Sequence, residues 1–456
     1  MNLKRMIMVF LLLTLSLSSL GCQQEETVPV KSKMIEFINN FNTYSSVKFN
    51  GSIILVEDNE VILDGGYGYS IFEDQINNTS DTIFPIGSIT KSFTATALLQ
   101  LEEEGKLSTN DNVSNYIKGF NPDFNVTIHH LLTHTSGLPR EGKVSFSQGI
   151  SIKENIDYIN NLELMFTPGS DFSYSNAGYI LLAAIIEEVA NLSYNEYIAK
   201  NIFKPLNMTA SVGGFDASYL ENQAIGYTIK NGKAIKENIY DLSIVTGSGN
   251  IYSTTKDLVK YLNSIEKETI LTNNSIEKML TTHWGDNNYG YGYGWEVYID
   301  REYECVAHGG TIGRSGYNSY LINYPKLDLS LILLSNTSSV TSLEVVRDSL
   351  LAIYFGEDVV VPKEANKSAI KDIALEEYGG TYFFNDNYSI DVIYENYSLY
   401  ITADDNNSYK LVPVIENTFQ YEGKEWIEAN FSFNDDKIIL TVKNINTSFQ
   451  FERIVK

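Results

Sequence analysis

Cysteine is almost absent from this chain, since only Cys22 and Cys305 occur among its 456 residues. A disulfide framework therefore does not organise the fold, and we expect Cys305 to be a free, inert thiol. Runs of lysine and arginine are also missing, and 33 basic against 57 acidic residues give a net charge of −24. Because nucleic-acid binding depends on cationic side chains that neutralise phosphates, this balance predicts no nucleic-acid partner.

Long apolar runs are missing as well, except at the N-terminus. Residues 1–21 place Lys4 and Arg5 before an apolar run over residues 6–15 and a segment of small or apolar residues. This order is typical of an export signal peptide, and the run is too short to span a bilayer. No other stretch of the sequence is apolar enough to do so.

The signal ends at Cys22, which follows Ser19, Leu20 and Gly21 and precedes a polar stretch. This order resembles the bacterial lipobox, in which cleavage leaves an acylated cysteine at the new N-terminus, although Ser19 replaces the usual aliphatic residue. We therefore expect Cys22 to be lipidated and to anchor an exported protein to the outer face of a bacterial cell membrane. Without lipidation the chain would be secreted.

Patterning predicts one large mixed domain, because helical and strand periodicities both occur between residues 35 and 355, after a linker over residues 22–34. Helices are expected over 88–105 and 176–189, and strands over 51–56, 60–70, 294–300, 319–324 and 329–335. This order predicts an α+β fold in which an antiparallel sheet is closed by N- and C-terminal segments around a helical insertion.

A second domain is predicted at the C-terminus. Residues 356–371 form a polar linker, and residues 372–456 carry short alternating segments between turns rich in Asn and Asp. This pattern fits a small all-β barrel or sandwich. The segment contains no histidine or cysteine, so we expect a supporting or binding module without catalytic groups.

Ser-x-x-Lys occurs six times, so context has to select among the copies. Only Ser88 follows a glycine and directly precedes a strongly amphipathic helix. Residues three apart share a helix face, which brings the Lys91 amine within reach of the Ser88 hydroxyl. A helix N-terminus also points backbone N–H groups at an oxyanion. The competing interpretation is a plain N-cap serine.

Tyr174 and Asn176 form a second candidate motif between Gly169 and a predicted helix. A loop edge of this kind lets a phenol project into a cleft. The phenol, with a pKa near 10, needs a decrease of about 3 units to act as a base at neutral pH. One cation about 4 Å away supplies a similar amount at an effective dielectric of about 20. Lys91 would suffice as that activator, and Asn176 could donate to a substrate carbonyl.

The third candidate is the run His308, Gly309, Gly310 and Thr311, placed before the late strands. Glycines beside a histidine let backbone approach a ligand closely, as an edge strand that forms one wall of a site requires. A loop histidine without a role is the competing interpretation.

These motifs, at 88–91, 174–176 and 308–310, stand in the order and approximate spacing of the class C β-lactamase and DD-peptidase family, which the chain resembles over residues 35–355. Matching flanks lie at 131–138, 249–254 and 291–295. The resemblance implies a β-lactamase/transpeptidase-like fold and a small peptide, ester or β-lactam substrate, with no cofactor and no metal. The C-terminal module also looks like the accessory domain of some relatives.

By the same resemblance Ser88 would be acylated, Lys91 and Tyr174 would shuttle its proton, and the N–H groups of Ser88 and Thr311 would form the oxyanion hole. Lactamases commonly present Lys-Thr-Gly where this chain has His308, Gly309 and Gly310. His308 is a weaker permanent cation than lysine, so we expect weak or no β-lactam turnover beside peptidase or esterase activity.

The sequence also bears on three alternative interpretations. A zinc site could use His130 and His134, but no His-Glu-x-x-His arrangement accompanies them. Gly-x-Ser-x-Gly, the nucleophile motif of α/β-hydrolases, is absent. A catalytically idle sensor or binding protein that keeps the fold remains the alternative from another class, and intact Ser88, Lys91 and Tyr174 argue against it.

Overall fold

The computed structural model describes residues 29–141, 152–214, 220–238, 241–286, 288–312, 315–369, 374–385, 388–402, 407–434 and 436–454. The predicted export signal and lipidated Cys22 lie outside the described residues. Within these ranges no single helix is long and apolar enough to cross a membrane. One bent pair, Asn176–Ala190 with Tyr194–Phe203, meets the length and composition criteria only when its two helices are combined.

An eight-stranded antiparallel sheet forms the centre of the larger part of the chain, in the order β10-β11-β12-β13-β14-β15-β1-β2. The strands are β1 (Gly51–Glu57), β2 (Glu60–Tyr67), β10 (Trp284–Gly285), β11 (Tyr289–Tyr291), β12 (Glu296–Asp300), β13 (Tyr303–Ile312), β14 (Tyr317–Tyr324) and β15 (Leu329–Ser335). β1 pairs with β15 from Gly51↔Ser335 to Glu57↔Leu329, so early and late segments close the sheet as the sequence predicts.

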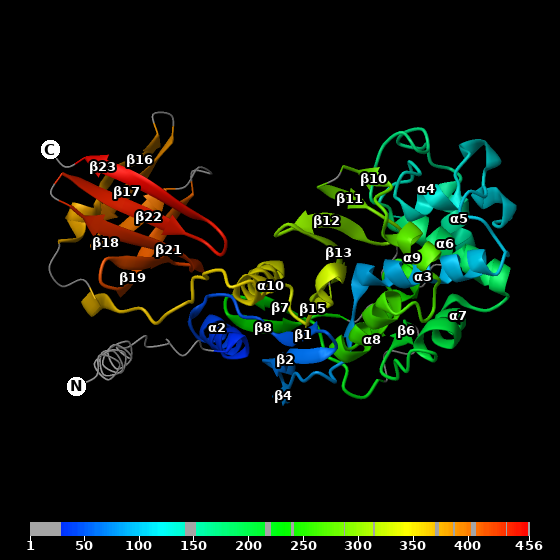
Figure 1. Cartoon of the computed structure of the whole chain (residues 1–456), viewed down its shortest axis with the longest axis horizontal. Helices are drawn as coiled ribbons and strands as arrows, with labels where there is room; N and C mark the ends of the chain where they lie inside the picture. The colour runs from blue at the N-terminus through cyan, green and yellow to red at the C-terminus, as the bar shows by residue number, and fades with distance from the viewer. Residues whose placement is uncertain are drawn as a thin grey trace, which may run out of the picture.

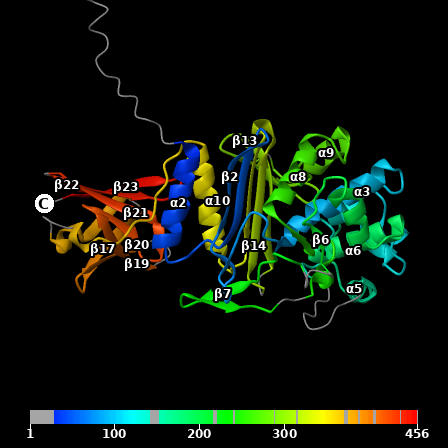
Figure 2. The ribbon, with the colours of Figure 1, turned by 90° about the horizontal axis from the view of Figure 1, so that it is seen from below.

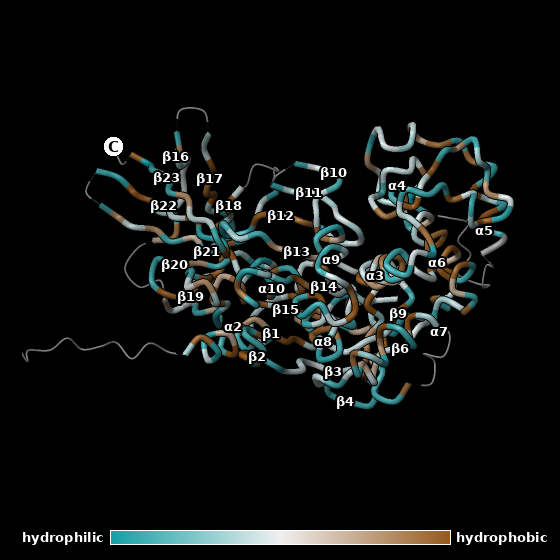
Figure 3. The backbone as a smooth tube through the Cα atoms, turned by 45° about the vertical axis from the view of Figure 1, so that its right-hand side comes forward, coloured by the Kyte–Doolittle hydropathy of each residue, from teal (hydrophilic) through white to brown (hydrophobic). Residues whose placement is uncertain are grey.

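Helices cover both faces of this sheet (Figure 2). On one face lie α2 (Val30–Tyr44) and α10 (Val340–Tyr354), and on the other lie α3 (Thr90–Glu103), α6 (Asn176–Ala190), α8 (Thr255–Glu266) and α9 (Asn273–Leu280). Every residue of β15 is buried, because its alternate side chains pack into two different cores. Figure 3 shows α6 as one of the hydrophobic stretches, and most of its side chains are buried.

The remaining elements of this part are short. They are α4 (Ile128–Leu132), α5 (Ile152–Ile159), α7 (Tyr194–Ile198), β3 (Tyr69–Ile71), β4 (Ile76–Asn77), β5 (Phe84–Pro85), β6 (Val212–Gly213), β7 (Tyr227–Lys230), β8 (Lys233–Lys236) and β9 (Ile251–Ser253). α2 begins at Val30, inside the predicted 22–34 linker, because Met34, Phe37, Ile38 and Phe41 form an apolar face that packs on the sheet. The predicted linker therefore extends too far along the chain, because residues 30–34 already belong to this helix.

A closed β-barrel forms the C-terminal part. Its strands are β16 (Gly380–Asn385), β17 (Tyr388–Glu395), β18 (Ser398–Thr402), β19 (Ser408–Ile415), β20 (Thr418–Tyr421), β21 (Lys424–Phe433), β22 (Lys437–Lys443) and β23 (Ser448–Ile454). The barrel packs beside α2 and α10, on the side of the sheet opposite α3 and α6 (Figure 1, Figure 2). Trp426 contacts Phe41 of α2 with 6.2 Å between ring centroids, and the Glu425 carboxylate accepts from the backbone N–H of Ser46 at 3.0 Å. The predicted α+β fold with a C-terminal barrel is confirmed.

Candidate active site

Ser88 lies in the 3-10 turn Gly87–Ile89 that leads into α3. The turn packs directly against β13: Gly87 has φ +54°, and a Cβ there would stand 3.0 Å from the Thr311 nitrogen. A Cβ at Gly310 would stand 2.2 Å from the Ile86 carbonyl oxygen. Side chains at these two positions would therefore push the strand away from the serine, and glycine permits the close approach.

Lys91 is the nearest basic group to Ser88, and its Nζ lies 3.1 Å from Ser88 Oγ. Nζ also donates to Asn176 Oδ1 at 2.7 Å and to the Ser248 carbonyl at 2.8 Å. Its side chain is fully buried. Burial lowers the pKa of the Lys91 amine well below its ordinary value; the Glu141 charge opposes this decrease and the Arg140 charge adds to it.

Both protonation states of the Lys91 amine fit this set of partners. An ammonium has three donors for the three oxygens of Ser88, Asn176 and Ser248, whereas a neutral amine has two N–H groups and one lone pair. In the neutral form, which burial favours, the oxygens of Asn176 and Ser248 take the two N–H groups and the lone pair faces the Ser88 hydroxyl. The geometry therefore equips Lys91 to deprotonate Ser88.

Tyr174 stands at the entry to α6, with Lys91 Nζ over its ring at 4.8 Å from the centroid. Burial raises the pKa of the Tyr174 phenol above its ordinary value, and this effect outweighs the opposite effects of hydrogen bonding to Ser88 and of the Arg140 charge. The two residues meet as the sequence analysis required, but the pKa of the Tyr174 phenol is raised rather than lowered as expected, because burial dominates. Tyr174 keeps its proton and is placed to donate it.

His308 lies on β13 and is 2% exposed. Its Nδ1 stands 2.7 Å from the Gly309 carbonyl, which only accepts, so Nδ1 carries the proton and Nε2 accepts from the Tyr291 hydroxyl at 3.1 Å. Burial, and then the Lys91 charge, lower the pKa of His308 to about 3. The imidazole is therefore neutral at any physiological pH and gives the site no cation.

The residues after His308 bring β13 to the nucleophile. Ser319 on β14 donates to the Ile86 carbonyl at 2.7 Å and is paired with Gly310, which ties the sheet to the turn before Ser88. Thr311 is exposed, and its hydroxyl donates to Asn318 at 3.1 Å. The backbone nitrogens of Ser88 and Thr311 thus belong to two segments in contact, the arrangement that an oxyanion hole requires.

Two charged residues at this site were missed by the sequence analysis. The Arg140 guanidinium lies 5.1 Å from the Tyr174 ring centroid. The Glu141 carboxylate accepts from Asn176 Nδ2 at 2.9 and 3.2 Å, so one substrate-facing donor expected of Asn176 is already engaged. The only sequence signal for them was their position shortly after the flanking segment 131–138.

The hypothetical zinc pair is not assembled as a metal site. His130 Nδ1 accepts from the backbone N–H of Thr127 at 3.2 Å and completes the cap of α4. His134 is buried beside Tyr174 instead. In the described ranges, no group of three or more His, Cys, Asp or Glu side chains is placed to hold a metal ion.

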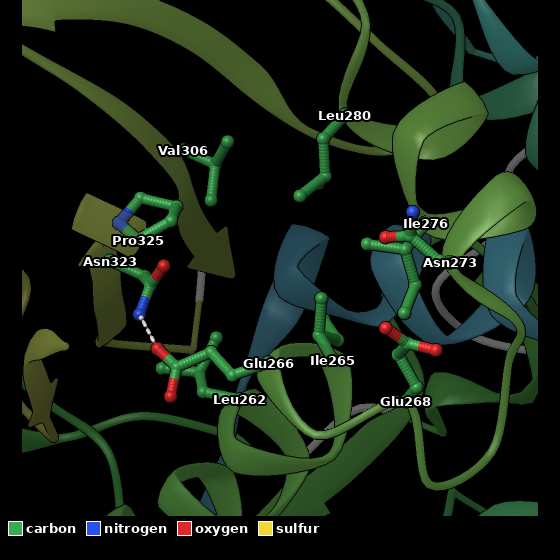
Figure 4. Close-up of a pocket in the computed structure, with 10 residues that line it drawn as sticks. All are labelled: Leu262, Ile265, Glu266, Glu268, Asn273, Ile276, Leu280, Val306, Asn323 and Pro325. Carbon is green, nitrogen blue, oxygen red and sulfur yellow. Dashed lines mark hydrogen bonds between the residues drawn. The ribbon is translucent and has the colours of Figure 1, made fainter.

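A separate cavity of about 150 Å³ lies between α8, α9 and the strands β13 and β14. Figure 4 shows apolar side chains such as Ile276 and Val306 around it, with the Glu266 carboxylate accepting from Asn323 at 2.7 Å. Neither Ser88 nor Lys91 lines this cavity. The candidate site is therefore the group around Ser88.

A family model described as Beta-lactamase matches residues 48–354, and the chain belongs to this family. Penicillin-binding protein 4* of Bacillus subtilis (strain 168) is 29% identical over 415 residues, which cover 85% of this chain and 91% of that protein. The octameric penicillin-binding protein homologue from Pyrococcus abyssi has a TM-score of 0.64 and 27% identity, covering 93% of this chain and 99% of that one.

The D-amino acid amidase from Ochrobactrum anthropi SV3 has a TM-score of 0.62 and 23% identity, covering 72% of this chain and 99% of that one, and this likeness shows the fold alone. The resemblance predicted from the three motifs is confirmed at the level of the family.

Proposed function

We propose that this protein is an exported, lipid-anchored serine hydrolase that cleaves amide or ester bonds through an acyl-enzyme on Ser88. The observation that carries the proposal is the fully buried Lys91, whose Nζ lies 3.1 Å from the Ser88 hydroxyl oxygen and whose pKa burial lowers well below its ordinary value. A protein that only binds its ligand has no need for a buried base beside a hydroxyl, and burying a lysine without pairing its charge is costly. This observation favours an enzyme over an idle sensor.

In the acylation step Lys91 takes the proton of Ser88, and the serine oxygen attacks the carbonyl carbon of the substrate. The oxyanion that forms is held by the N–H groups of Ser88 and Thr311. Tyr174 then donates its phenolic proton to the leaving amine or alcohol, and the ammonium of Lys91, with Nζ over the phenol ring, returns a proton to Tyr174. Every residue regains its starting protonation state, and the acyl group stays on Ser88.

Deacylation reverses the roles, with water as the nucleophile. The water gives a proton to Lys91, its oxygen bonds to the acyl carbon, and Tyr174 protonates Ser88 as the bond between the serine oxygen and the acyl carbon breaks and the acid leaves. The Lys91 ammonium then returns a proton to Tyr174. The same two groups therefore serve both half-reactions.

The neutral His308 selects among substrates in this proposal. A lysine in its place would attract the carboxylate that β-lactams carry, whereas a neutral imidazole offers no such attraction. We therefore assign neutral short esters and peptides of D-amino acids as the substrate class, with weak or no β-lactam turnover. The name of one relative, a penicillin-binding protein, supports the peptide side of this assignment.

The test uses purified protein without residues 1–21, a fluorophosphonate probe and a panel of D-alanyl peptides, nitrophenyl esters and a chromogenic cephalosporin. We expect the probe on the peptide that contains Ser88, ester or peptide turnover above that of the cephalosporin, and loss of both labelling and turnover in Ser88→Ala. An adduct on another residue, or full activity in Ser88→Ala, would overturn the proposal. A protein that labels with penicillin but turns over nothing would favour the sensor.

A further inference from the structure

His134 is a buried histidine that the proposed reaction does not use. Its side chain is 0% exposed, and its ring centroid lies 4.2 Å from that of Tyr174. Its φ is +58°, in the left-handed region, which is uncommon for residues other than glycine, although Asn, Asp and His adopt it more often than most. A titratable group buried directly against the proposed proton donor calls for an explanation beyond packing.

His134 holds both backbone groups that flank Tyr174. The N–H of Ser173 donates to the His134 carbonyl at 2.9 Å, and the N–H of Ser175 donates to His134 Nδ1 at 3.0 Å. Ser175 in turn caps α6, and its hydroxyl donates to the Pro139 carbonyl at 2.7 Å. The segment on which the phenol stands is therefore built on His134.

The hydrogen bonds also fix the protonation state of His134. Because Nδ1 accepts from an N–H group, the proton of the neutral ring is on Nε2. Nε2 has no hydrogen-bond partner among the described residues and is surrounded by the rings of Tyr174, Tyr179 and Tyr291, at 4.2, 5.1 and 4.7 Å between centroids. A filler residue would not retain an unsatisfied N–H at this depth, where its desolvation is costly.

We infer that His134 is the positioning residue of the proton donor: through Nδ1 it fixes the Ser173–Ser175 backbone so that the Tyr174 hydroxyl reaches the leaving group. This inference rests on the proposed function, and it assigns His134 no contact with substrate. The position of the His134 ring sets the direction of the Tyr174 phenol. A neutral His134 also places no second positive charge near Lys91. Nothing in the Ser-x-x-Lys or Tyr-x-Asn motifs identifies this role.

The role predicts an effect that depends on the leaving group. Nitrophenolate departs without a proton, whereas an alkoxide or an amine requires one in the transition state. Loss of the Nδ1 acceptor should therefore harm alkyl esters and amides much more than nitrophenyl esters of the same acid. A general loss of folding or of substrate binding would lower all of them by one factor.

Two variants of His134 distinguish the role of its Nδ1 acceptor from the role of its aromatic ring. His134→Phe keeps an aromatic ring against Tyr174 and removes the acceptor, whereas His134→Asn keeps an acceptor at a similar distance from the backbone and tolerates the positive φ. Specificity constants, kcat/KM, are measured on a nitrophenyl ester, an alkyl ester and a D-alanyl amide, with Tyr174→Phe as the reference. Circular dichroism and thermal melting check that each variant is folded.

We expect His134→Phe to lose about tenfold or more in kcat/KM on the alkyl ester relative to the nitrophenyl ester. His134→Asn should restore most of that difference, and His134→Phe combined with Tyr174→Phe should be no slower on the alkyl ester than Tyr174→Phe alone. Equal losses on all leaving groups, failure of asparagine to rescue, or additive losses in the double variant would each overturn the inference. If the wild type turns over no ester or amide at all, it is the proposed function that fails.

Discussion

Lys91→Met offers a test of the neutral lysine that needs no substrate. The unfolded chain holds this amine near a pKa of about 10.4, whereas burial lowers the pKa well below that value in the folded protein. Between the two pKa values the unfolded state binds one more proton than the folded state. The free energy of unfolding therefore rises with pH across this window, by up to about 1.4 kcal/mol per pH unit.

Methionine has a similar length and no titratable group, so Lys91→Met removes this slope. Methionine cannot donate to Asn176 or Ser248, and this cost is the same at every pH. We expect the stability of the variant relative to wild type to fall by up to roughly 3 kcal/mol between pH 7 and pH 9. Urea unfolding at pH 6, 7, 8 and 9, followed by fluorescence, gives the difference directly. Contributions from other groups cancel, because both proteins share them.

Lys256→Met is the matched control. Its amine donates to Asp81 at 2.8 Å near the surface, and this hydrogen bond raises the pKa of Lys256. Because that lysine is protonated in both states below about pH 9, its removal should shift stability by an amount that does not change with pH. If Lys91→Met behaves like Lys256→Met, Lys91 is an ammonium in the folded protein, and the mechanism proposed for Ser88 is refuted.

Three further predictions concern substrate selection by His308, membrane anchoring through Cys22 and the role of the C-terminal barrel. His308→Lys should raise the ratio of cephalosporin to ester kcat/KM by about tenfold or more, equivalent to about 1.4 kcal/mol, while the neutral His308→Gln should not. An unchanged ratio would show that other residues of the site select the substrate. Cys22→Ala should release the protein from bacterial membranes into the medium, as shown by immunoblots of both fractions, and unchanged retention would contradict lipidation. Trp426→Ala should lower the free energy of unfolding by about 3–5 kcal/mol, because it empties a buried contact with α2. Its kcat on small esters should match wild type, and so should that of a chain truncated near Lys371; a rate as low as that of Ser88→Ala would show that the barrel carries catalytic groups.

Much of the fold follows from the sequence because its signals are local. The apolar run of β15 and the stripe of α6 are strong patterns, and both elements appear where expected. α2 was not predicted, although its four buried side chains have the i, i+3, i+4 and i+7 spacing of an amphipathic helix. The start of the domain was misplaced because the first turn of this helix was assigned to the polar linker.

The candidate site likewise contains some contacts that the sequence predicts and others that it does not. Ser88 and Lys91 are three residues apart on one turn, and their contact follows from helix geometry alone. Ser248, which lies 157 residues from Lys91, supplies the carbonyl that fixes the amine, and no spacing rule predicts it. The protonation states were also beyond the sequence, because they depend on burial that only the assembled fold creates.

Burial acts on Lys91, Tyr174 and His308 in one direction, which is against their charged forms. It favours a neutral amine at Lys91 and a neutral phenol at Tyr174, and it lowers the pKa of His308 to about 3. In the proposed reaction the new charges are an ammonium at Lys91 and an oxyanion between two backbone N–H groups. Opposite charges that arise together in a poorly solvated site stabilise each other more than they would in water, and they do so in the transition state rather than in the bound substrate. A lysine at position 308 would be a permanent cation, and it would strengthen the binding of anionic substrates before any bond is made or broken. This chain has a neutral imidazole at that position instead.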